Sequence, residues 1–428
     1  MMRLARLLLY RVAPRAAGWA VAEHPVGSEL GLAELAAVGR VVLSRRSLSF
    51  GSDIERFERR FGEVVAARHA VALSSGSAAL ALAAQLLRLG AGDEVVATTQ
   101  TFRATILPFV ARGVRLRFAD TDAGGLDVDP AAVRAAITER TRAVLVTHHG
   151  GVPAALDALR AICRERHVAL VEDCAHALGA TFDGQPIGGS DGGGRSICCF
   201  SFGSLKNITT LGEGGMLCTD NARWADEARA LRGWGVLARR RTPREPPQIG
   251  RYRRVPDVYD HAGESWDVDL DDVEEVGCNR RMSIAAAAVG LAQLRRLDGL
   301  LARRRHIAAR YDEAIATIDG LRVRHVDRRA APARHLYTCL VDPDRVDRDQ
   351  LLQALQREHG VRLYLRYLPL HLSALMRARG HRLGECPNAE RVFFEELVEL
   401  PLSARMSRFE VAHVIAALRA ASASATRR

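Results

Sequence analysis

Lysine is almost absent from this chain of 428 residues, in which Lys206 is the one lysine among 61 basic residues. Arginine can replace a surface lysine wherever charge or phosphate binding is needed, but it does not lose its proton near neutral pH. A lysine amine can be desolvated, deprotonated and used to attack a carbonyl group as a Schiff-base nucleophile. Either one lysine survived by chance in an arginine-rich sequence, or Lys206 is retained for this chemistry.

The eight cysteines include no Cys-x-x-Cys pair and show no regular spacing. This absence excludes the usual zinc and iron–sulfur ligand patterns, so no metal site is predicted. Most of the cysteines lie in apolar stretches, where a thiol packs like a small hydrophobic group. We therefore expect a reducing, cytoplasmic environment rather than a disulfide scaffold.

No apolar run is long enough to span a membrane, and no span is predicted. Residues 1–22 are basic and apolar and contain no acidic residue. They resemble a short targeting or interfacial segment, and the alternative is an N-terminal extension without function. The net charge of +11 is dispersed along the chain and accompanies no nucleic-acid-binding motif. A phosphorylated small-molecule partner is therefore favoured over nucleic acid.

Helical and strand patterns alternate between residues 53 and 202. Helices are predicted over residues 53–66, 76–90, 103–113, 129–138 and 156–167. Strands are predicted over residues 69–75, 93–99, 114–120, 142–149, 168–175 and 196–202. This alternation predicts a doubly wound α/β domain with a mostly parallel central sheet. Ligands of such sheets bind beyond the carboxyl ends of the strands.

The alternating pattern breaks between residues 235 and 275, where proline and arginine are followed by acidic residues. This composition predicts an irregular loop. A long helical stretch comes next, and the last part of the chain has the mixed pattern of a small α+β domain. We therefore divide the chain into the extension 1–22, a large domain 23–285, and an interdomain helix with a small C-terminal domain 286–428.

Two candidate cofactor-binding features follow predicted strands. Residues 74–77 (Ser-Ser-Gly-Ser) precede a helix, where free N–H groups and the helix dipole can bind a phosphate. The same residues are also an ordinary helix cap. Asp173 ends an apolar strand, and His176 comes three residues later. A carboxylate there can hold a protonated pyridine nitrogen, or it can simply cap a helix.

Two further residues belong to the same pattern. Ser201 lies five residues before Lys206 at a predicted strand end, where its hydroxyl can meet a phosphate. Phe102 is expected to end another strand and can stack on a flat ring, with core packing as the alternative. Together with Lys206 and Asp173, these residues are the parts of a pyridoxal 5'-phosphate (PLP) site.

The sequence resembles the DegT/DnrJ/EryC1/StrS family of sugar aminotransferases, within the fold type I PLP-dependent transferases. The resemblance runs from about Leu43 to Ser407 and rests on several motifs in the expected order. They include "VALSSGSAALALA", "GAGDEVVATTQTFRAT", "LVEDCAHALGA", "FSFGSLKNITTLGEGGML" and "GCNRRMSIAAAAVGLAQL". The resemblance implies an α/β large domain that binds PLP and a smaller C-terminal α+β domain.

The family pattern also implies a role for each candidate residue. Lys206 is expected to form the Schiff base with PLP, and Asp173 to hold the ring nitrogen. His176 stands beside the 3-hydroxyl of the cofactor, and Phe102 stands on the stacking position. The positions that contact the phosphate are Gly76, Ser77, Ala78 and Ser201.

Asn279 matches an asparagine that reaches the cofactor phosphate of the neighbouring subunit, which implies a homodimer with shared active sites. The chain departs from the family nearby, because Cys278 and Arg280 stand where an aromatic residue is usual. Ser77 replaces a commoner threonine, and "TTQTF" lacks the usual proline. These departures bear on the identity of the substrate more than on the chemistry of the cofactor.

The expected activity is transfer of an amino group from an amino acid, with glutamate as the expected donor, to a nucleotide-linked keto sugar. Such a reaction belongs to the biosynthesis of amino sugars, cell-surface polysaccharides or secondary metabolites. One alternative is a family relative that makes an aminocyclitol or an aromatic amine. The sugar dehydratase branch is disfavoured, because histidine replaces the Schiff-base lysine there and Lys206 is present here.

Overall fold

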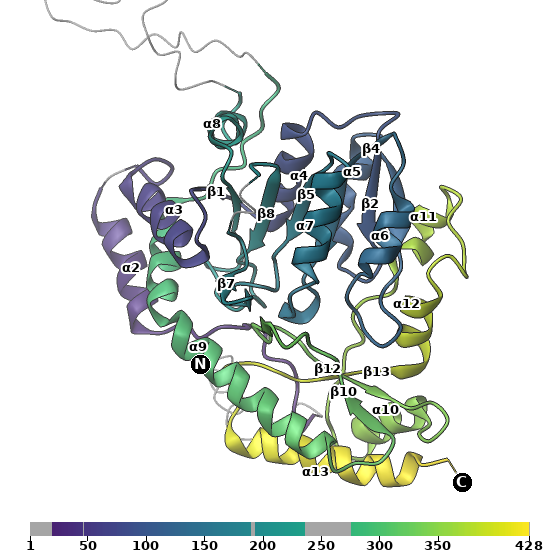
Figure 1. Ribbon diagram of the computed structural model, residues 1–428. Coiled ribbons are helices and arrows are strands. Elements are labelled where there is room, and N and C mark those ends of the chain that lie inside the picture. The colour runs from purple at the N-terminus through teal and green to yellow at the C-terminus, as the bar shows by residue number, and fades with distance from the viewer. Residues whose placement is uncertain (1–18, 46, 190–192, 236–274, 428) are drawn as a thin grey trace, which may run out of the picture.

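The computed structural model describes residues 19–45, 47–189, 193–235 and 275–427 (Figure 1). Most of the predicted extension 1–22 and of the predicted loop 235–275 therefore lies outside the described residues. The large domain occupies the upper part of Figure 1, and the small domain with the C-terminus lies below it.

A seven-stranded sheet forms the centre of the large domain, in the order β1-β9-β8-β5-β4-β2-β3. Its strands are β1 (His69–Leu73), β2 (Glu94–Thr98), β3 (Arg115–Ala119), β4 (Thr141–Thr147), β5 (Ala169–Asp173), β8 (Ser196–Ser201) and β9 (Gly215–Thr219). β9 runs antiparallel to both of its neighbours, and the other six strands are parallel to one another. The prediction of a mostly parallel sheet is confirmed, and the six predicted strands are found to within two residues at each end.

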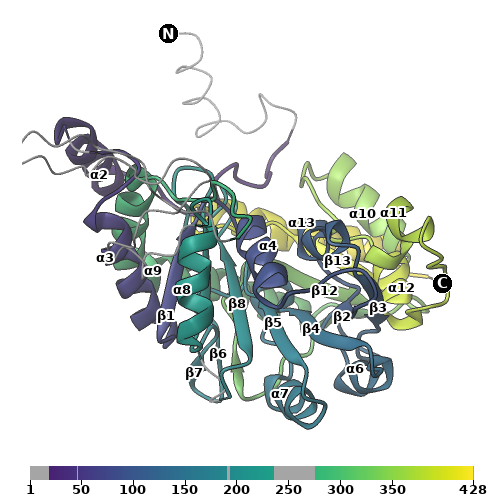
Figure 2. The ribbon, with the colours of Figure 1, turned by 90° about the horizontal axis from the view of Figure 1, so that it is seen from above.

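Helices cover both faces of this sheet (Figure 2). Val95 and Ala97 of β2 share one core with α4 (Gly76–Leu86), α5 (Leu107–Ala111) and α8 (Ala222–Leu231). Val96, between them, points to the opposite face and packs with α6 (Pro130–Ala136) and α7 (Leu156–Glu165). Since successive side chains of a strand point to opposite faces, the near-continuous apolar strands of the sequence are explained by burial on both sides.

The long helix α9 (Ile284–Ile315) connects the two domains. Ser283 caps its start by accepting a hydrogen bond from the N–H of Ala286. Leu297 and Leu301 pack in a core of the large domain, where α9 also meets α2 (Leu32–Leu43) and α3 (Ser52–Val65). Further along α9, Tyr311 is fully buried in the core of the small domain. The proposed boundary at residues 285/286 thus falls at the start of a helix that packs in both cores.

An antiparallel sheet with the order β10-β12-β13 forms the small domain. Its elements are β10 (Leu321–Val323), α10 (Arg348–Arg357), β12 (Tyr337–Val341), β13 (Leu397–Leu400) and α13 (Arg408–Ala425). The short strands β6 (Thr181–Phe182), β7 (Gln185–Pro186) and β11 (Ala330–Ala331) form a third sheet, which joins the segment after β5 to the segment after β10. The short helices α11 (Ala374–Arg377) and α12 (Pro387–Arg391) return to the large domain, where Met376 and Ala389 enter its core.

Across the residues that the structure describes, no helix combines the length and the apolar character needed to cross a membrane.

Candidate active site

Apart from Asn279, the predicted site residues lie at or near the carboxyl edge of the central sheet. β5 ends at Asp173, which lies in register with Thr147, the last residue of β4. β8 ends at Ser201, which pairs with Gly215 at the start of β9. Because five neighbouring parallel strands end at this edge, residues far apart in the sequence are brought to one place.

Lys206 lies in the turn between β8 and β9. Its N–H donates to the carbonyl of Gly203 at 3.0 Å, and Gly27 donates its N–H to the carbonyl of Ser204 at 2.8 Å. A Cβ atom at Gly27 would lie 1.9 Å from the carbonyl oxygen of Leu205, so this contact requires glycine. The segment around Gly27 therefore packs against the turn that carries Lys206 and fixes its position.

The amine of Lys206 is desolvated within the site. Burial lowers its pKa from 10.5 to about 8, with the charge of Asp173 acting in the opposite direction and that of Arg366 adding to the decrease. An amine with this pKa is partly unprotonated near neutral pH, which is the form that attacks carbonyl groups. Lys206 therefore lies in an environment where a lysine amine can lose its proton near neutral pH, whereas an arginine side chain would keep its charge.

Asp173 is only 5% exposed. Its Oδ1 accepts a hydrogen bond from the N–H of Ala175 at 3.0 Å, and its Oδ2 accepts one from the hydroxyl of Thr105 at 2.6 Å. Hydrogen bonds to the ionised form stabilise a buried carboxylate. The two hydrogen bonds therefore fix the orientation of the Asp173 carboxyl group, which lies within electrostatic range of Lys206.

The ring of His176 forms one wall of the site. It stacks on His335 with ring centroids 4.2 Å apart, and Tyr367 lies nearly parallel at 6.2 Å. Burial lowers the pKa of His176 well below its ordinary value, and the charge of Lys206 contributes. Its Nδ1 accepts the N–H of Gly150 at 3.3 Å, so the neutral ring carries its proton on Nε2. His176 thus offers a fixed N–H donor.

Helix α4 places its N-terminus beside Ser201. Ser75 is the N-cap, and its hydroxyl accepts the N–H of Ala78 at 3.1 Å. The amide of Ala78 is therefore already used, and the first amides of the helix, those of Gly76 and Ser77, are the ones without a partner inside the helix. A Cβ atom at Gly76 would lie 2.7 Å from the Cβ of Ser201, so the approach of helix and strand depends on this glycine.

Phe102 does not end a strand, and that prediction is wrong. β2 ends at Thr98, and the chain turns away from the sheet before the short 3-10 helix at Arg103–Thr105. The ring of Phe102 is half-buried, and its centroid lies 5.4 Å from that of Tyr367. Phe102 therefore makes an aromatic contact with Tyr367, although β2 ends before it.

Asn279 is exposed on the surface of this chain. Its Oδ1 accepts the N–H of Arg281 at 3.5 Å, and the carbonyl of Arg280 accepts the N–H of Ser74 at 2.7 Å. These contacts fix the segment beside the end of β1. The described residues show no hydrogen bond between Asn279 and either Lys206 or Asp173, so the structure of one chain does not bring this residue into the site.

Sequence reasoning missed Thr105, Tyr367 and His335. Thr105 lies three residues after Phe102, so the same motif carried a signal for it. Tyr367 and His335 come from the C-terminal third of the chain, and nothing in their local sequence pointed to the site. Both residues belong to segments after α9 that return from the small domain to the large one: His335 donates its N–H to the carbonyl of Gly150, and the carbonyl of Tyr367 accepts the side-chain amide of Gln100.

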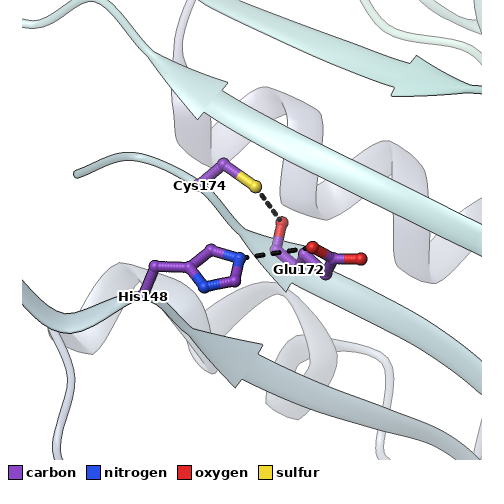
Figure 3. Close-up of side chains that lie close together, drawn as sticks. All are labelled: His148, Glu172 and Cys174. Carbon is purple, nitrogen blue, oxygen red and sulfur yellow. Dashed lines mark hydrogen bonds and ion pairs between the residues drawn. The ribbon is translucent and has the colours of Figure 1, made fainter. Parts of the chain in front are cut away.

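A group of His148, Glu172 and Cys174 lies behind the site (Figure 3) and has the residue types of a metal centre. His148 accepts the N–H of Ala154 on Nδ1 at 3.1 Å, so its Nε2 carries the proton that it donates to Glu172 at 3.2 Å. The thiol of Cys174 donates to the backbone carbonyl of Glu172 at 3.6 Å. Each group thus has a hydrogen-bond role, and the geometry is that of a buried polar contact.

The chemistry of the residues present fits PLP. They supply an amine nucleophile, a buried carboxylate for a ring nitrogen, an N–H donor, and a helix N-terminus next to a serine hydroxyl for a phosphate. The model of the DegT/DnrJ/EryC1/StrS aminotransferase family matches residues 29–419. The chain belongs to this family. It is accordingly a PLP-dependent aminotransferase.

Known relatives agree with this assignment. The aminotransferase is 35% identical over 375 residues to the spore coat polysaccharide biosynthesis protein SpsC of Bacillus subtilis, covering 87% of this chain and 90% of the relative. The solved aminotransferase TlmJ of Streptoalloteichus hindustanus is 33% identical, with a TM-score of 0.80 over 94% of this chain and 99% of that one.

The cofactor is supported by a third relative. A Streptococcus pneumoniae protein assigned as a sugar aminotransferase has been solved in a PLP form, at 25% identity and a TM-score of 0.80, and in a PMP form, at 26% identity and a TM-score of 0.81. Each alignment covers 94% of this chain and 99% of that one. The structure and the family together make PLP the cofactor of this aminotransferase.

Proposed function

We propose that this aminotransferase transfers an amino group from an amino acid, with glutamate as the expected donor, to a nucleotide-linked keto sugar. The observation that carries the proposal is the buried amine of Lys206 facing the carboxylate of Asp173 at the edge of the sheet. The naming of SpsC for polysaccharide biosynthesis and of the S. pneumoniae relative as a sugar aminotransferase supports a sugar substrate.

Each residue of the site has a proposed part in holding PLP. Asp173 binds the ring nitrogen, and the Nε2–H of His176 donates to the 3-hydroxyl oxygen. The ring of Phe102 stacks on the cofactor ring. The phosphate is held by the N-terminus of α4 and the hydroxyl next to it, through Gly76, Ser77, Ala78 and Ser201. For Ala78 the contact is indirect, because its N–H fixes the cap residue Ser75.

When bound, PLP supplies an electron-withdrawing ring that stabilises negative charge at the reacting carbon. Lys206, with a pKa of about 8, holds or releases a proton at Nζ near neutral pH. It can therefore remove a proton from the α-carbon of the donor and later deliver one to the sugar carbon. The carboxylate of Asp173 would pair with the protonated ring nitrogen through a charge-assisted hydrogen bond. The rings of His176, His335 and Tyr367 exclude water from one side.

A homodimer with shared active sites is also proposed, since Asn279 is exposed and, among the described residues, makes no hydrogen bond to Lys206 or Asp173. The adjoining segments carry exposed apolar side chains: Trp234 is 53% exposed and Val276 is 84% exposed. Phe50, 60% exposed, and Trp234 both lie against the guanidinium group of Arg281, at 4.8 and 4.0 Å. An exposed aromatic and arginine surface of this kind is typical of interface centres.

The substrate is tested with the purified holoenzyme. Glutamate is offered with a set of nucleotide-linked keto sugars, and products are followed by the mass change that accompanies replacement of a carbonyl oxygen by an amino group. Lys206→Arg is the control, because it keeps the charge and lacks a nucleophilic amine; we expect it to be inactive. Amination of cyclitol ketones with no turnover of any nucleotide-linked sugar would favour the aminocyclitol alternative instead.

A further inference from the structure

Three buried threonines form a chain of hydroxyl groups that ends on Asp173. Thr147 is the last residue of β4, Thr101 lies three residues beyond β2, and Thr105 lies in the following 3-10 helix. The hydroxyl oxygens of Thr147 and Thr101 are 2.8 Å apart, and those of Thr101 and Thr105 are 2.9 Å apart. Thr105 lies 2.6 Å from Oδ2 of Asp173. None of the three threonines is more than 4% exposed.

The hydrogen bond between Thr105 and Asp173 fixes the direction of the other hydrogen bonds in this row of hydroxyl groups. Thr105 donates its single hydroxyl proton to Oδ2 of Asp173. The oxygen of Thr105 must then accept the proton of Thr101, and that of Thr101 must accept the proton of Thr147. All three hydroxyl dipoles therefore point toward the carboxylate, and each bond polarises the next.

We propose that Thr105 is a positioning residue for Asp173, and that Thr101 and Thr147 supply a polarised hydroxyl chain behind it. The chain joins the ends of three neighbouring strands, β2, β4 and β5, to one carboxylate. It fixes the plane of the Asp173 carboxyl group, because Oδ1 is held by Ala175 and Oδ2 by Thr105. One lone pair of Oδ2 remains for a second donor.

Other groups near Asp173 do not duplicate this role. Lys206 faces it with a charge and belongs to the reacting groups. Tyr367 and the thiol of Cys199 lie within electrostatic range, and burial keeps both protonated by raising the pKa of each. Among the described residues, the side-chain hydrogen bond to Asp173 comes from Thr105. A loss of that hydroxyl is therefore expected to weaken the hold of Asp173 on the cofactor ring.

The inference rests on the proposed role of Asp173, and two substitutions at position 105 test it. Thr105→Val keeps the shape and removes the hydroxyl, whereas Thr105→Ser keeps the hydroxyl and removes a methyl group. The full-length chain is freed of cofactor and titrated with PLP, and the dissociation constant is read from the visible absorbance of the bound form. Folding is checked by thermal unfolding of each variant.

Thr105→Val is expected to bind PLP roughly tenfold more weakly, since a hydrogen bond to a charged group has about this value. Thr105→Ser should stay within about threefold of the parent. Thr101→Val leaves the last bond in place and removes its polarising neighbour, so a smaller loss, about twofold to threefold, is expected. Thr219→Val is the matched control: its buried hydroxyl donates to the carbonyl of Ser196 at the far end of β9.

Three results would overturn the proposal. If Thr105→Ser binds as weakly as Thr105→Val, the methyl group matters and the hydroxyl does not. If neither variant changes PLP affinity while Asp173→Ala lowers it, the threonine hydroxyl groups have no positioning role. The assignment of Asp173 to the cofactor ring then stands. If Asp173→Ala also leaves PLP affinity unchanged, the proposed role of Asp173 itself fails.

Discussion

A chain with one lysine allows the acid–base state of the proposed catalytic amine to be measured directly. Amine-specific reagents modify only unprotonated amines, and this chain offers them two targets, Lys206 and the N-terminal amine. Burial lowers the pKa of Lys206 from 10.5 to about 8. The rate at which cofactor-free protein is modified at Lys206 should therefore rise through a midpoint near pH 8, more than two pH units below that of an exposed lysine.

The expected difference is large at neutral pH. At pH 7.5 roughly a quarter of amines with a pKa of about 8 are unprotonated, against roughly one in a thousand with a pKa of 10.5. The ratio of reactive amine is thus roughly 200-fold. Restricted access to a half-buried side chain reduces the absolute rate equally at every pH. The midpoint, rather than the rate, is for this reason the quantity to measure.

The assay is a pH series of brief labelling reactions, followed by peptide mapping with mass detection, which separates Lys206 from the N-terminus. Arg310→Lys supplies an internal reference, because residue 310 is exposed on α9 and a lysine there should have an ordinary pKa. The Asp173→Asn variant tests whether the charge of Asp173 contributes to the pKa of Lys206. The charge of Asp173 raises the pKa of Lys206, so its removal should move the midpoint to lower pH.

Three outcomes would contradict this reasoning. A midpoint for Lys206 equal to that of the reference lysine would show that burial does not perturb the amine. A midpoint that rises in the Asp173→Asn variant would show that the two groups do not face each other. Labelling of Lys206 that persists unchanged after addition of PLP would show that the cofactor does not use this amine.

Three further predictions concern catalysis, the phosphate site and the dimer. Asp173→Ala should lower kcat on the order of 100-fold or more in steady-state assays, because one preorganised electrostatic contact is lost. Gly76→Ala should weaken PLP binding in titrations, since the new Cβ would meet Ser201 at 2.7 Å and displace the helix N-terminus. Mixing inactive Lys206→Ala with inactive Asn279→Asp should restore activity toward roughly half per heterodimer, as one of two sites is intact. Mixtures that stay inactive while both variants remain dimeric would exclude a role of Asn279 across the interface.

The sheet, and the strand-end positions of Asp173 and Ser201 in the candidate site, could be predicted because their signals are local. Each buried parallel strand is a short apolar run, and the residues after it are small, polar or charged. Asp173 and Ser201 were placed correctly from this pattern alone, since each is the last residue of its strand. The position of Phe102 was misjudged because the strand signal in "DEVVATTQTF" fades gradually, whereas the hydrogen-bonded strand stops at Thr98.

The rest of the site depends on contacts between distant segments. His335 stacks on His176 across 159 positions of sequence. The three threonine hydroxyl groups can meet only because the ends of β2 and β4 are neighbours in the sheet. The sequence of neither segment indicates this strand order. A buried hydroxyl also has no distinctive pattern, because threonine is common in strands for reasons of shape.

The interdomain helix links the two halves of the site physically. Arg304 of α9 is 1% exposed and remains charged at neutral pH, although burial lowers its pKa to about 10. Its guanidinium group donates to the carbonyl of Gly27 at 2.6 Å and to that of His335 at 3.2 Å. Gly27 in turn holds the Lys206 turn through Ser204. One buried cation therefore fixes both the turn that carries the amine and the ring that backs His176, so the geometry of the site depends on α9 as well as on the sheet.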